Sequence, residues 1–213
     1  KGLSNYYPTL GFLFEKNDGF NCYRNLLQLS GTKDAVVQFN TMDTTVHGSA
    51  VWPFATDGTL VQFNVFKHLR NPDADCYVCH FDYNCIGTVM QYNYGYDVQG
   101  GLIQVLVASQ YEHAFQEDAI ARYNVGVNVG WRNNDNSAGI HVSGRAKRSK
   151  IYNNTIITKW KNQYKGISLN NWGGEYPRYT KIYNNVFYAG GTPSTHHGVS
   201  QMNANGNLVS HNL

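Results

Sequence analysis

The chain has few charged residues. Only 15% of its 213 residues are Asp, Glu, Lys or Arg, whereas about a quarter is usual in a soluble domain. The formal net charge of +3 is too small to indicate nucleic acid or a membrane surface as a partner. No apolar run approaches the roughly 20 residues of a transmembrane helix. No window of about 12 residues shows the apolar spacing of an amphipathic helix either.

Asparagine, glycine and tyrosine are abundant instead. The sequence contains 25 Asn, 21 Gly and 16 Tyr. Asn and Gly tolerate the left-handed backbone that tight turns need, and Tyr favours strands. This composition predicts an all-β fold with many short strands, and the length is sufficient for one domain with a full core.

A four-residue pattern recurs along the chain: an apolar residue, any residue, usually an aromatic residue, and Asn. The spacing between copies is 24 to 31 residues, which is typical of a solenoid. Stacked coils place equivalent residues about 4.8 Å apart, so the amides can hydrogen-bond from coil to coil as an asparagine ladder. We therefore expect about seven stacked coils. The copies end at Asn40, Asn64, Asn93, Asn124, Asn154, Asn185 and Asn212.

The residues around each ladder Asn have expected places. The apolar residue three positions earlier should fill the interior. The aromatic residue directly before Asn, from Phe39 in the first copy to Tyr123 in the fourth, should stack in the same layer. The last three copies carry Asn153, Asn184 and His211 there, which predicts a more polar interior toward the C-terminal end.

A second recurring strand usually begins at Gly, as in Gly139-Ile140-His141-Val142-Ser143. Its alternation predicts that Ile140 and Val142 point inward and that His141 and Ser143 point outward. Equivalent positions in other coils should form one outward row on this face. The row comprises Trp52, His80, Asp82, Gln104, His141, Ser143, Ser168, Asn170, Ser200 and Met202.

The two ends of the chain are less regular than its middle. Residues 1–34 predict an atypical first coil of a single domain that covers residues 1–213. The sequence begins at Lys1 without an initiator Met and ends directly after a ladder Asn. We therefore expect a piece of a longer product, or a partner that covers the last coil.

Two sequence features resemble a known family. The repeat Ile-Tyr-Asn-Asn-(Thr/Val)-(Ile/Phe), with Gly-Ile further on, resembles right-handed parallel β-helix proteins of the pectate-lyase-like superfamily. The segment from Phe81 to Tyr94, followed by Asp97-x-x-Gly100-Gly101, is similar to a narrower group of secreted bacterial β-helix proteins. The resemblance covers about residues 35–212. It implies a secreted protein, and its relatives include polysaccharide lyases, glycoside hydrolases, epimerases, esterases and non-catalytic spikes.

The four cysteines allow two interpretations. Cys76-x-x-Cys79 lies next to His80, as in some metal sites, but a zinc site needs a second ligand pair at short spacing. The other two cysteines are Cys22 and Cys85, and an even total of four favours one or two disulfides in a secreted protein.

A glycoside hydrolase needs two carboxyl groups, about 6.5–9.5 Å apart for inversion and about 5–5.5 Å apart for retention. The best candidate pair is Asp82 with Glu112 or Glu117, because the strand that carries Asp82 precedes the loop that carries those acids. Loops on a rigid scaffold commonly hold functional residues. The acids of the loops beside the Gly-led strands are Asp73, Asp75, Glu112, Glu117, Asp118 and Asp135.

A polysaccharide lyase needs a base and a cation that neutralises a uronate carboxylate. The candidate bases are His80, His113 and His141, and the candidate cations are Arg122, Arg145 and Lys147.

A non-catalytic module that binds polysaccharide is the third interpretation. The tryptophans are candidates to stack on sugar rings, namely Trp52, Trp131, Trp160 and Trp172, with Trp52 and Trp131 preferred. Gln104, Arg122 and Asn170 are candidates to hydrogen-bond the ligand. We expect a carbohydrate-active enzyme, hydrolase ahead of lyase, with the binding module as the alternative. No cofactor is expected, although acidic loops could bind calcium. The oligomeric state stays open.

Overall fold

The computed structural model describes residues 8–72, 75–108, 111–132, 137–158, 165–189 and 205–213. These residues are almost entirely strand and turn, and the only helix among them is the short 3-10 turn η1 (Trp172–Gly174). The predicted all-β class is therefore confirmed. Among the described residues, no helix is long and apolar enough to cross a membrane.

Most strands belong to three long sheets. Sheet I contains β2 (Leu13–Glu15), β6 (Val36–Gln38), β9 (Leu60–Gln62), β13 (Val89–Gln91), β17 (Ile120–Arg122), β20 (Lys150–Tyr152), β23 (Lys181–Tyr183) and β25 (Leu208–Ser210). Sheet II contains β3 (Asp18–Cys22), β7 (Thr41–Thr45), β10 (Val65–Lys67), β14 (Tyr94–Val98), β18 (Val125–Val129), β21 (Thr155–Thr158) and β24 (Val186–Ala189). Sheet III contains β4 (Leu27–Ser30), β8 (Val51–Phe54), β11 (Tyr77–Phe81), β15 (Gly101–Val107), β19 (Ile140–Gly144) and β22 (Ile167–Asn170). Two short pairs complete the set, β1 (Thr9–Leu10) with β5 (Thr32–Lys33) and β12 (Cys85–Ile86) with β16 (Gln116–Glu117).

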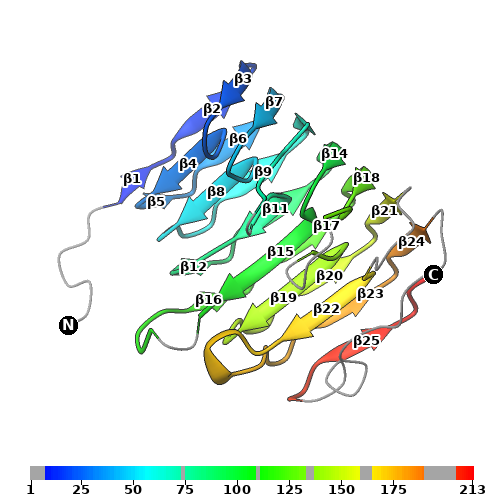
Figure 1. Ribbon diagram of the computed structural model, residues 1–213. Helices are drawn as coiled ribbons and strands as arrows, with labels where there is room; N and C mark the ends of the chain where they lie inside the picture. Colours follow the sequence, from blue (N-terminus) through cyan, green and yellow to red (C-terminus); the bar gives the residue numbers. More distant parts are fainter. Residues whose placement is uncertain (1–7, 73–74, 109–110, 133–136, 159–164, 190–204) are drawn as a thin grey trace.

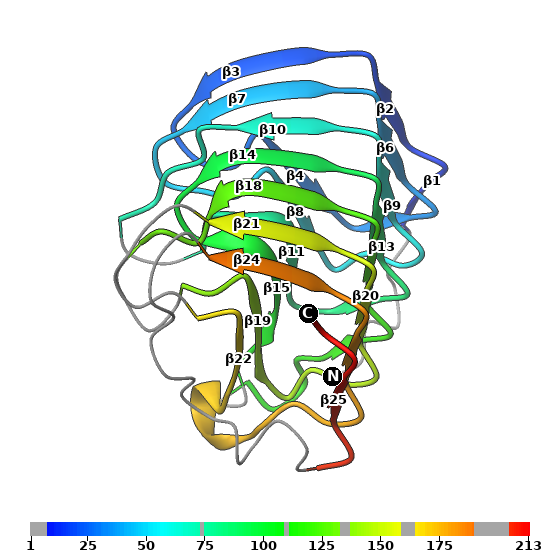
Figure 2. The same cartoon turned by 90° about the vertical axis from the view of Figure 1, so that its right-hand side faces the viewer.

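Every strand pairs in parallel with its counterpart one turn of the chain away. In sheet I, for example, Met90 of β13 lies opposite Val61 of β9 and Ala121 of β17. Figure 1 shows the turns stacked in sequence order, and Figure 2 shows sheet II as a stack from β3 to β24. This arrangement is compatible with a parallel β-helix.

The residue before each repeated Asn has a left-handed backbone. Its φ is 56° at Phe39, 55° at Tyr123 and 55° at Asn153. The repeated Asn lies at the corner where the chain passes from a strand of sheet I to a strand of sheet II. The left-handed residue directs its side chain out of this corner, and Phe39 and Tyr123 are 51% and 40% exposed. The expected aromatic layer therefore lies outside the solenoid, and the prediction of a more polar C-terminal interior is wrong. Asn suits this position because it tolerates the left-handed conformation.

Four exposed aromatic rings, those directly before Asn40, Asn64, Asn93 and Asn124, form what we call the aromatic stack. Phe39 and Phe63 have ring centroids 5.3 Å apart, and the next two steps, to Tyr92 and to Tyr123, are 5.1 Å each. The rings are nearly parallel, so each covers the faces of its neighbours.

The repeated asparagines are joined by hydrogen bonds, and we call them the asparagine stack. The Asn93 backbone N–H and Nδ2 both donate to Oδ1 of Asn124, at 3.0 and 3.1 Å. Nδ2 of Asn124 donates in turn to Oδ1 of Asn154 and to the Met90 carbonyl, both at 3.0 Å. Each amide thus satisfies backbone groups that are buried at the corner.

The asparagine stack has one more member than the seven expected from the sequence. Asn17 Nδ2 donates to Oδ1 of Asn40 at 3.0 Å, and strands β2 and β3 on either side of it pair with β6 and β7. The expected irregular segment 1–34 therefore already contains strands in register with the rest. Phe14-Glu15-Lys16-Asn17 fits the pattern with a polar residue before Asn, as the last three copies do.

A row of polar side chains crosses the outer face of sheet I. Gln62 Nε2 donates to Oε1 of Gln38, and Gln91 Nε2 donates to Oε1 of Gln62, at 2.9 and 2.8 Å. Arg122 Nε donates to Gln91 and its Nη1 donates to the Tyr152 hydroxyl, at 2.8 and 3.0 Å. Arg122 is therefore held in a surface network.

Alternate residues of sheet III fill the interior, as expected. Val51, Cys79, Ile103 and Ile140 lie side by side on four neighbouring strands and are fully buried. Val142, two residues after Ile140, is also fully buried. The inward alternation predicted for this strand is confirmed.

The predicted disulfides are wrong. All four cysteines are free thiols. Cys79 occupies a packing position in the interior between Val51 and Ile103, while Cys85 lies at the start of β12 and donates to the Pro53 carbonyl at 3.4 Å. Burial raises the pKa of the Cys76 and Cys85 thiols to about 11, so both stay protonated at neutral pH.

Replacing Asn124 by Ala is expected to lower the free energy of unfolding by about 2–4 kcal/mol, because the two Asn93 donors lose their acceptor inside the protein. The control is Asn153→Gly, which lies next to the stack and should change stability by less than about 1 kcal/mol because Gly accepts φ of 55° without strain. Urea unfolding measures both variants. Equal effects of the two substitutions would contradict a supporting role for the stack.

Candidate functional site

The outer face of sheet III holds a row of polar side chains from separate turns of the chain. His80 of β11, Gln104 of β15, His141 of β19 and Ser168 of β22 are neighbours in the strand register. Trp52 of β8 extends the row, with its ring stacked on His80 at 6.1 Å. The predicted outward direction is therefore correct. The sequence did not reveal that His80, Gln104 and His141 are at most 4% exposed.

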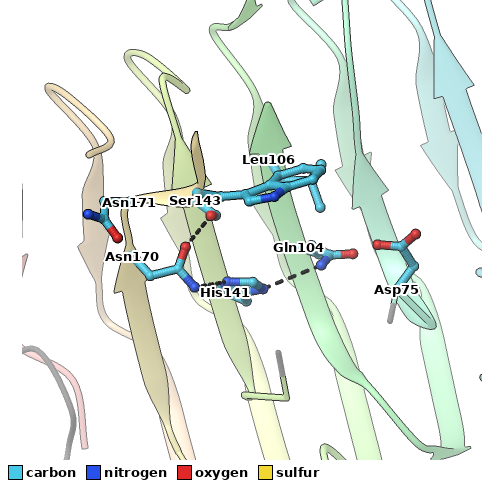
Figure 3. Close-up of a pocket in the computed structure, with 8 residues that line it drawn as sticks. Asp75, Gln104, Leu106, His141, Ser143, Asn170 and Asn171 are labelled. Atoms are coloured by element: carbon cyan, nitrogen blue, oxygen red, sulfur yellow. Dashed lines mark hydrogen bonds between the residues drawn. The ribbon is translucent and has the colours of Figure 1, made fainter. Parts of the chain in front are cut away.

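A cavity of about 500 Å³ opens over β15, β19 and β22. Its described lining residues combine one carboxylate, amides, a hydroxyl, an imidazole and an indole (Figure 3). They are Asp75, Gln104, Leu106, His141, Ser143, Asn170, Asn171 and Trp172.

A hydrogen-bonded series of side chains forms one wall of the cavity (Figure 3). The Ser143 hydroxyl donates to Oδ1 of Asn170, and Nδ2 of Asn170 lies 2.8 Å from Nε2 of His141. Nδ1 of His141 lies 3.3 Å from the Gln104 amide. A neutral imidazole has one donor and one acceptor nitrogen. The shorter contact makes Nε2 the acceptor, so Nδ1 carries the proton and its longer contact, with Nε2 of the Gln104 amide, is a weak one.

His141 is a neutral, fixed residue. Burial lowers its pKa to about 4, although the Asn170 contact works in the opposite direction. Both ring nitrogens contact amides, at 2.8 and 3.3 Å. This geometry favours positioning of the neighbouring amides over the role of a base.

Asp82 directly follows β11, beside the cavity rather than in its described lining. Its carboxylate accepts a hydrogen bond from the Trp52 indole N–H and another from the Tyr83 backbone N–H at 2.8 Å. Burial raises the pKa of Asp82 to about 6, and the negative charge of Asp75 acts in the same direction. Asp82 therefore titrates close to neutral pH.

His80 is held in place by a hydrogen bond from the Ser49 hydroxyl. The Cys76 and Tyr77 backbone N–H groups both donate to Ser49 Oγ at 3.0 Å, so the Ser49 hydroxyl hydrogen is left to donate to His80 Nδ1 at 2.9 Å. The His80 proton is then on Nε2, which lies 4.0 Å from Oδ2 of Asp82.

The two other candidate acids lie elsewhere. Glu112 is on the surface, with its side chain 88% exposed. Glu117 belongs to β16 and forms ion pairs with Arg148 at 2.6 Å and Lys147 at 3.8 Å. Neither residue lines the cavity, and Asp75 is the loop acid that does.

The remaining candidates lie on other faces or corners. Arg122 belongs to the outer row of sheet I. Trp131 donates to Oδ1 of Asp97 at 3.1 Å and packs against the Arg70 guanidinium, 5.2 Å from its ring centroid. Both residues have structural contacts away from the cavity. Asp73, Asp135, Trp160, Ser200 and Met202 lie outside the described residues.

Sequence reasoning named Asp75 only as one of six loop acids and Trp172 only as one of four tryptophans, and it did not name Asn171, although all three line the cavity. A usable signal was their position, since Asp75 lies two residues before β11 and Asn171 directly follows β22. The described residues contain no group of three or more His, Cys, Asp or Glu side chains suited to a metal ion.

A comparison with known protein families finds no match for this chain, and a comparison with curated proteins finds none either.

Asp82 and His141 should give opposite pH dependences of stability. The folded-state pKa of Asp82 is raised, so its charged form opposes folding and stability falls as pH rises from about 4 to 6. The folded-state pKa of His141 is lowered, so stability rises from about pH 4 to 6.5. Since one pKa unit corresponds to about 1.4 kcal/mol, each group should change the free energy of unfolding by roughly 2–4 kcal/mol over its pH range.

The test measures the free energy of unfolding of Asp82→Asn and His141→Gln at several pH values between 4 and 7. In Asp82→Asn, which keeps His141, stability should rise with pH relative to wild type. In His141→Gln it should fall. Parallel profiles for the two variants would show that one or both groups are not buried as described.

Proposed function

We propose that this protein is a secreted carbohydrate-active protein with a right-handed parallel β-helix of the pectate-lyase-like type. The cavity over β15, β19 and β22 is proposed to bind part of an extracellular polysaccharide. The cavity lining is the observation that supports this most directly. A sugar ring presents C–H groups on its faces and hydroxyls around its rim. The Trp172 indole suits the former, and the Asp75 carboxylate and the Asn and Gln amides suit the latter.

Hydrolysis is the favoured reaction, and the proposed pair is Asp75 with Asp82 instead of Asp82 with Glu112 or Glu117. Asp82 keeps a proton up to about pH 6 and suits the general acid. Asp75, in the cavity lining, suits the base that activates water. Two carboxyls in unlike environments are the usual basis for such a division of roles.

Elimination has less support. Among the described residues that line the cavity there is no Arg or Lys to neutralise a uronate carboxylate. His141, the best placed of the candidate bases, already contacts amides through both ring nitrogens.

A non-catalytic binding module is the second candidate. It is favoured by the burial of Asp82, which is 3% exposed, since this leaves Asp75 as the one carboxylate in the described lining of the cavity. A polysaccharide-binding solenoid needs the cavity but no general acid.

The experiment measures reducing ends released from a polysaccharide panel, together with absorbance near 235 nm from unsaturated products. Asp75→Asn and Asp82→Asn are each expected to lower the release of reducing ends by about 100-fold or more. The control is Asp18→Asn, an exposed acid of sheet II, which should keep full activity.

Three results would change the proposal. Absorbance near 235 nm would indicate a lyase. Binding of polysaccharide without any release of reducing ends would indicate the binding module. Full activity in both Asp75→Asn and Asp82→Asn would contradict the proposed catalytic pair.

A further inference from the structure

A second cavity, of about 650 Å³, lies beside the first. It is lined by three aromatic residues, Phe54, Tyr83 and Tyr111, together with Asn84, Glu112, His113 and Ala114. The Tyr83 ring lies 6.1 Å from the ring of Trp172, which lines the first cavity. The Tyr83 and Trp172 rings therefore separate two adjoining cavities on one side of the molecule.

The rings at this boundary meet at an angle. Tyr83 makes an angle of 67° with Tyr111 and 72° with Trp172. Tyr111 and Trp172 are 55% and 43% exposed. The aromatic stack, in contrast, has parallel rings that cover one another. The angled rings are thus better arranged to pack on the C–H face of a sugar.

The charges around both cavities suit a neutral ligand. One carboxylate lines each cavity, Asp75 in the first and Glu112 in the second, and no Arg or Lys is among their described lining residues. Arg145 comes near, with Nη1 donating to the Glu112 carbonyl at 2.8 Å, but its guanidinium also forms an ion pair with Glu175 at 3.2 Å. A chain of uronates would place negative charges next to these two carboxylates.

Polar partners accompany the rings in both cavities. Ser143 and Asn171 supply a hydroxyl and an amide in the first, while Asn84 and His113 supply an amide and an imidazole in the second. Amides and hydroxyls both donate and accept, as sugar hydroxyls require.

We propose that the second cavity is a further sugar subsite, so that a chain of neutral sugars spans both cavities across the Tyr83 and Trp172 rings. This inference depends on the proposed function, because it extends the ligand of the first cavity. It places Glu112 and His113 beside the second part of the chain.

The test measures the affinity of the full chain for oligosaccharides of increasing length by calorimetry. The neutral probes are gluco-, xylo- and manno-oligosaccharides of two to six units, and the acidic probe is oligogalacturonate. For a neutral series that binds, we expect affinity to rise about tenfold or more between two and four units. Oligogalacturonate of equal length should bind more weakly.

Variants assign this gain to the second cavity. Tyr111→Ala should remove the gain with length and leave the affinity for the disaccharide unchanged, while Tyr111→Phe should restore the gain. Trp172→Ala should weaken binding at every length. The matched control is Tyr188→Ala, a 64% exposed tyrosine of β24 in sheet II, which should bind as wild type does.

The outcomes separate the two proposals. A gain with length that persists in Tyr111→Ala, or tighter binding of oligogalacturonate, would overturn the second subsite and leave the first cavity as the binding site. Failure of every oligosaccharide to bind would overturn the proposed function and the subsite together.

Discussion

The rest of the structure depends on the hydrogen bonds that each repeated Asn donates, through its backbone N–H and its side-chain amide, to the amide oxygen of the Asn in the next turn. At every corner the residue before Asn adopts a left-handed backbone, as at Tyr123, and this costs about 1–2 kcal/mol for most residue types. The amide oxygen of Asn124 offsets this by accepting from the backbone and side chain of Asn93. Because the same bonds recur at each turn, they set the register of all three sheets.

That register builds the candidate site from distant parts of the sequence. Gln104, His141 and Ser168 come from different turns, yet the parallel pairing of β15, β19 and β22 places them side by side. Once adjacent, they support one another: Asn170 and Gln104 fix His141, and burial keeps the imidazole neutral. A cavity wall of this kind requires a rigid scaffold, which the regular corners provide.

The sequence predicted the repeating elements well because their physics is local. The period of the Asn residues and the alternation around Ile140 and Val142 depend only on turn and strand geometry. The sequence could not predict which loop acid lies near sheet III. Asp75 and Glu117 are both acids in segments next to a strand, and only the three-dimensional path of the chain places Asp75 at the cavity and Glu117 beside Arg148. It also could not predict burial of Asp82, which depends on neighbours such as Trp52. The disulfide prediction failed because Cys79 is an interior packing residue.

The central claim is that the cavity over β15, β19 and β22 binds a sugar. It is tested most directly by a crystal structure of the protein with a neutral oligosaccharide that saturates it in solution. The account predicts a sugar ring packed against Trp172, with its hydroxyls hydrogen-bonded to Asp75 and to the Asn170 or Asn171 amide. A well-ordered sugar bound only elsewhere, for example along the aromatic stack, with the cavity empty, would contradict it.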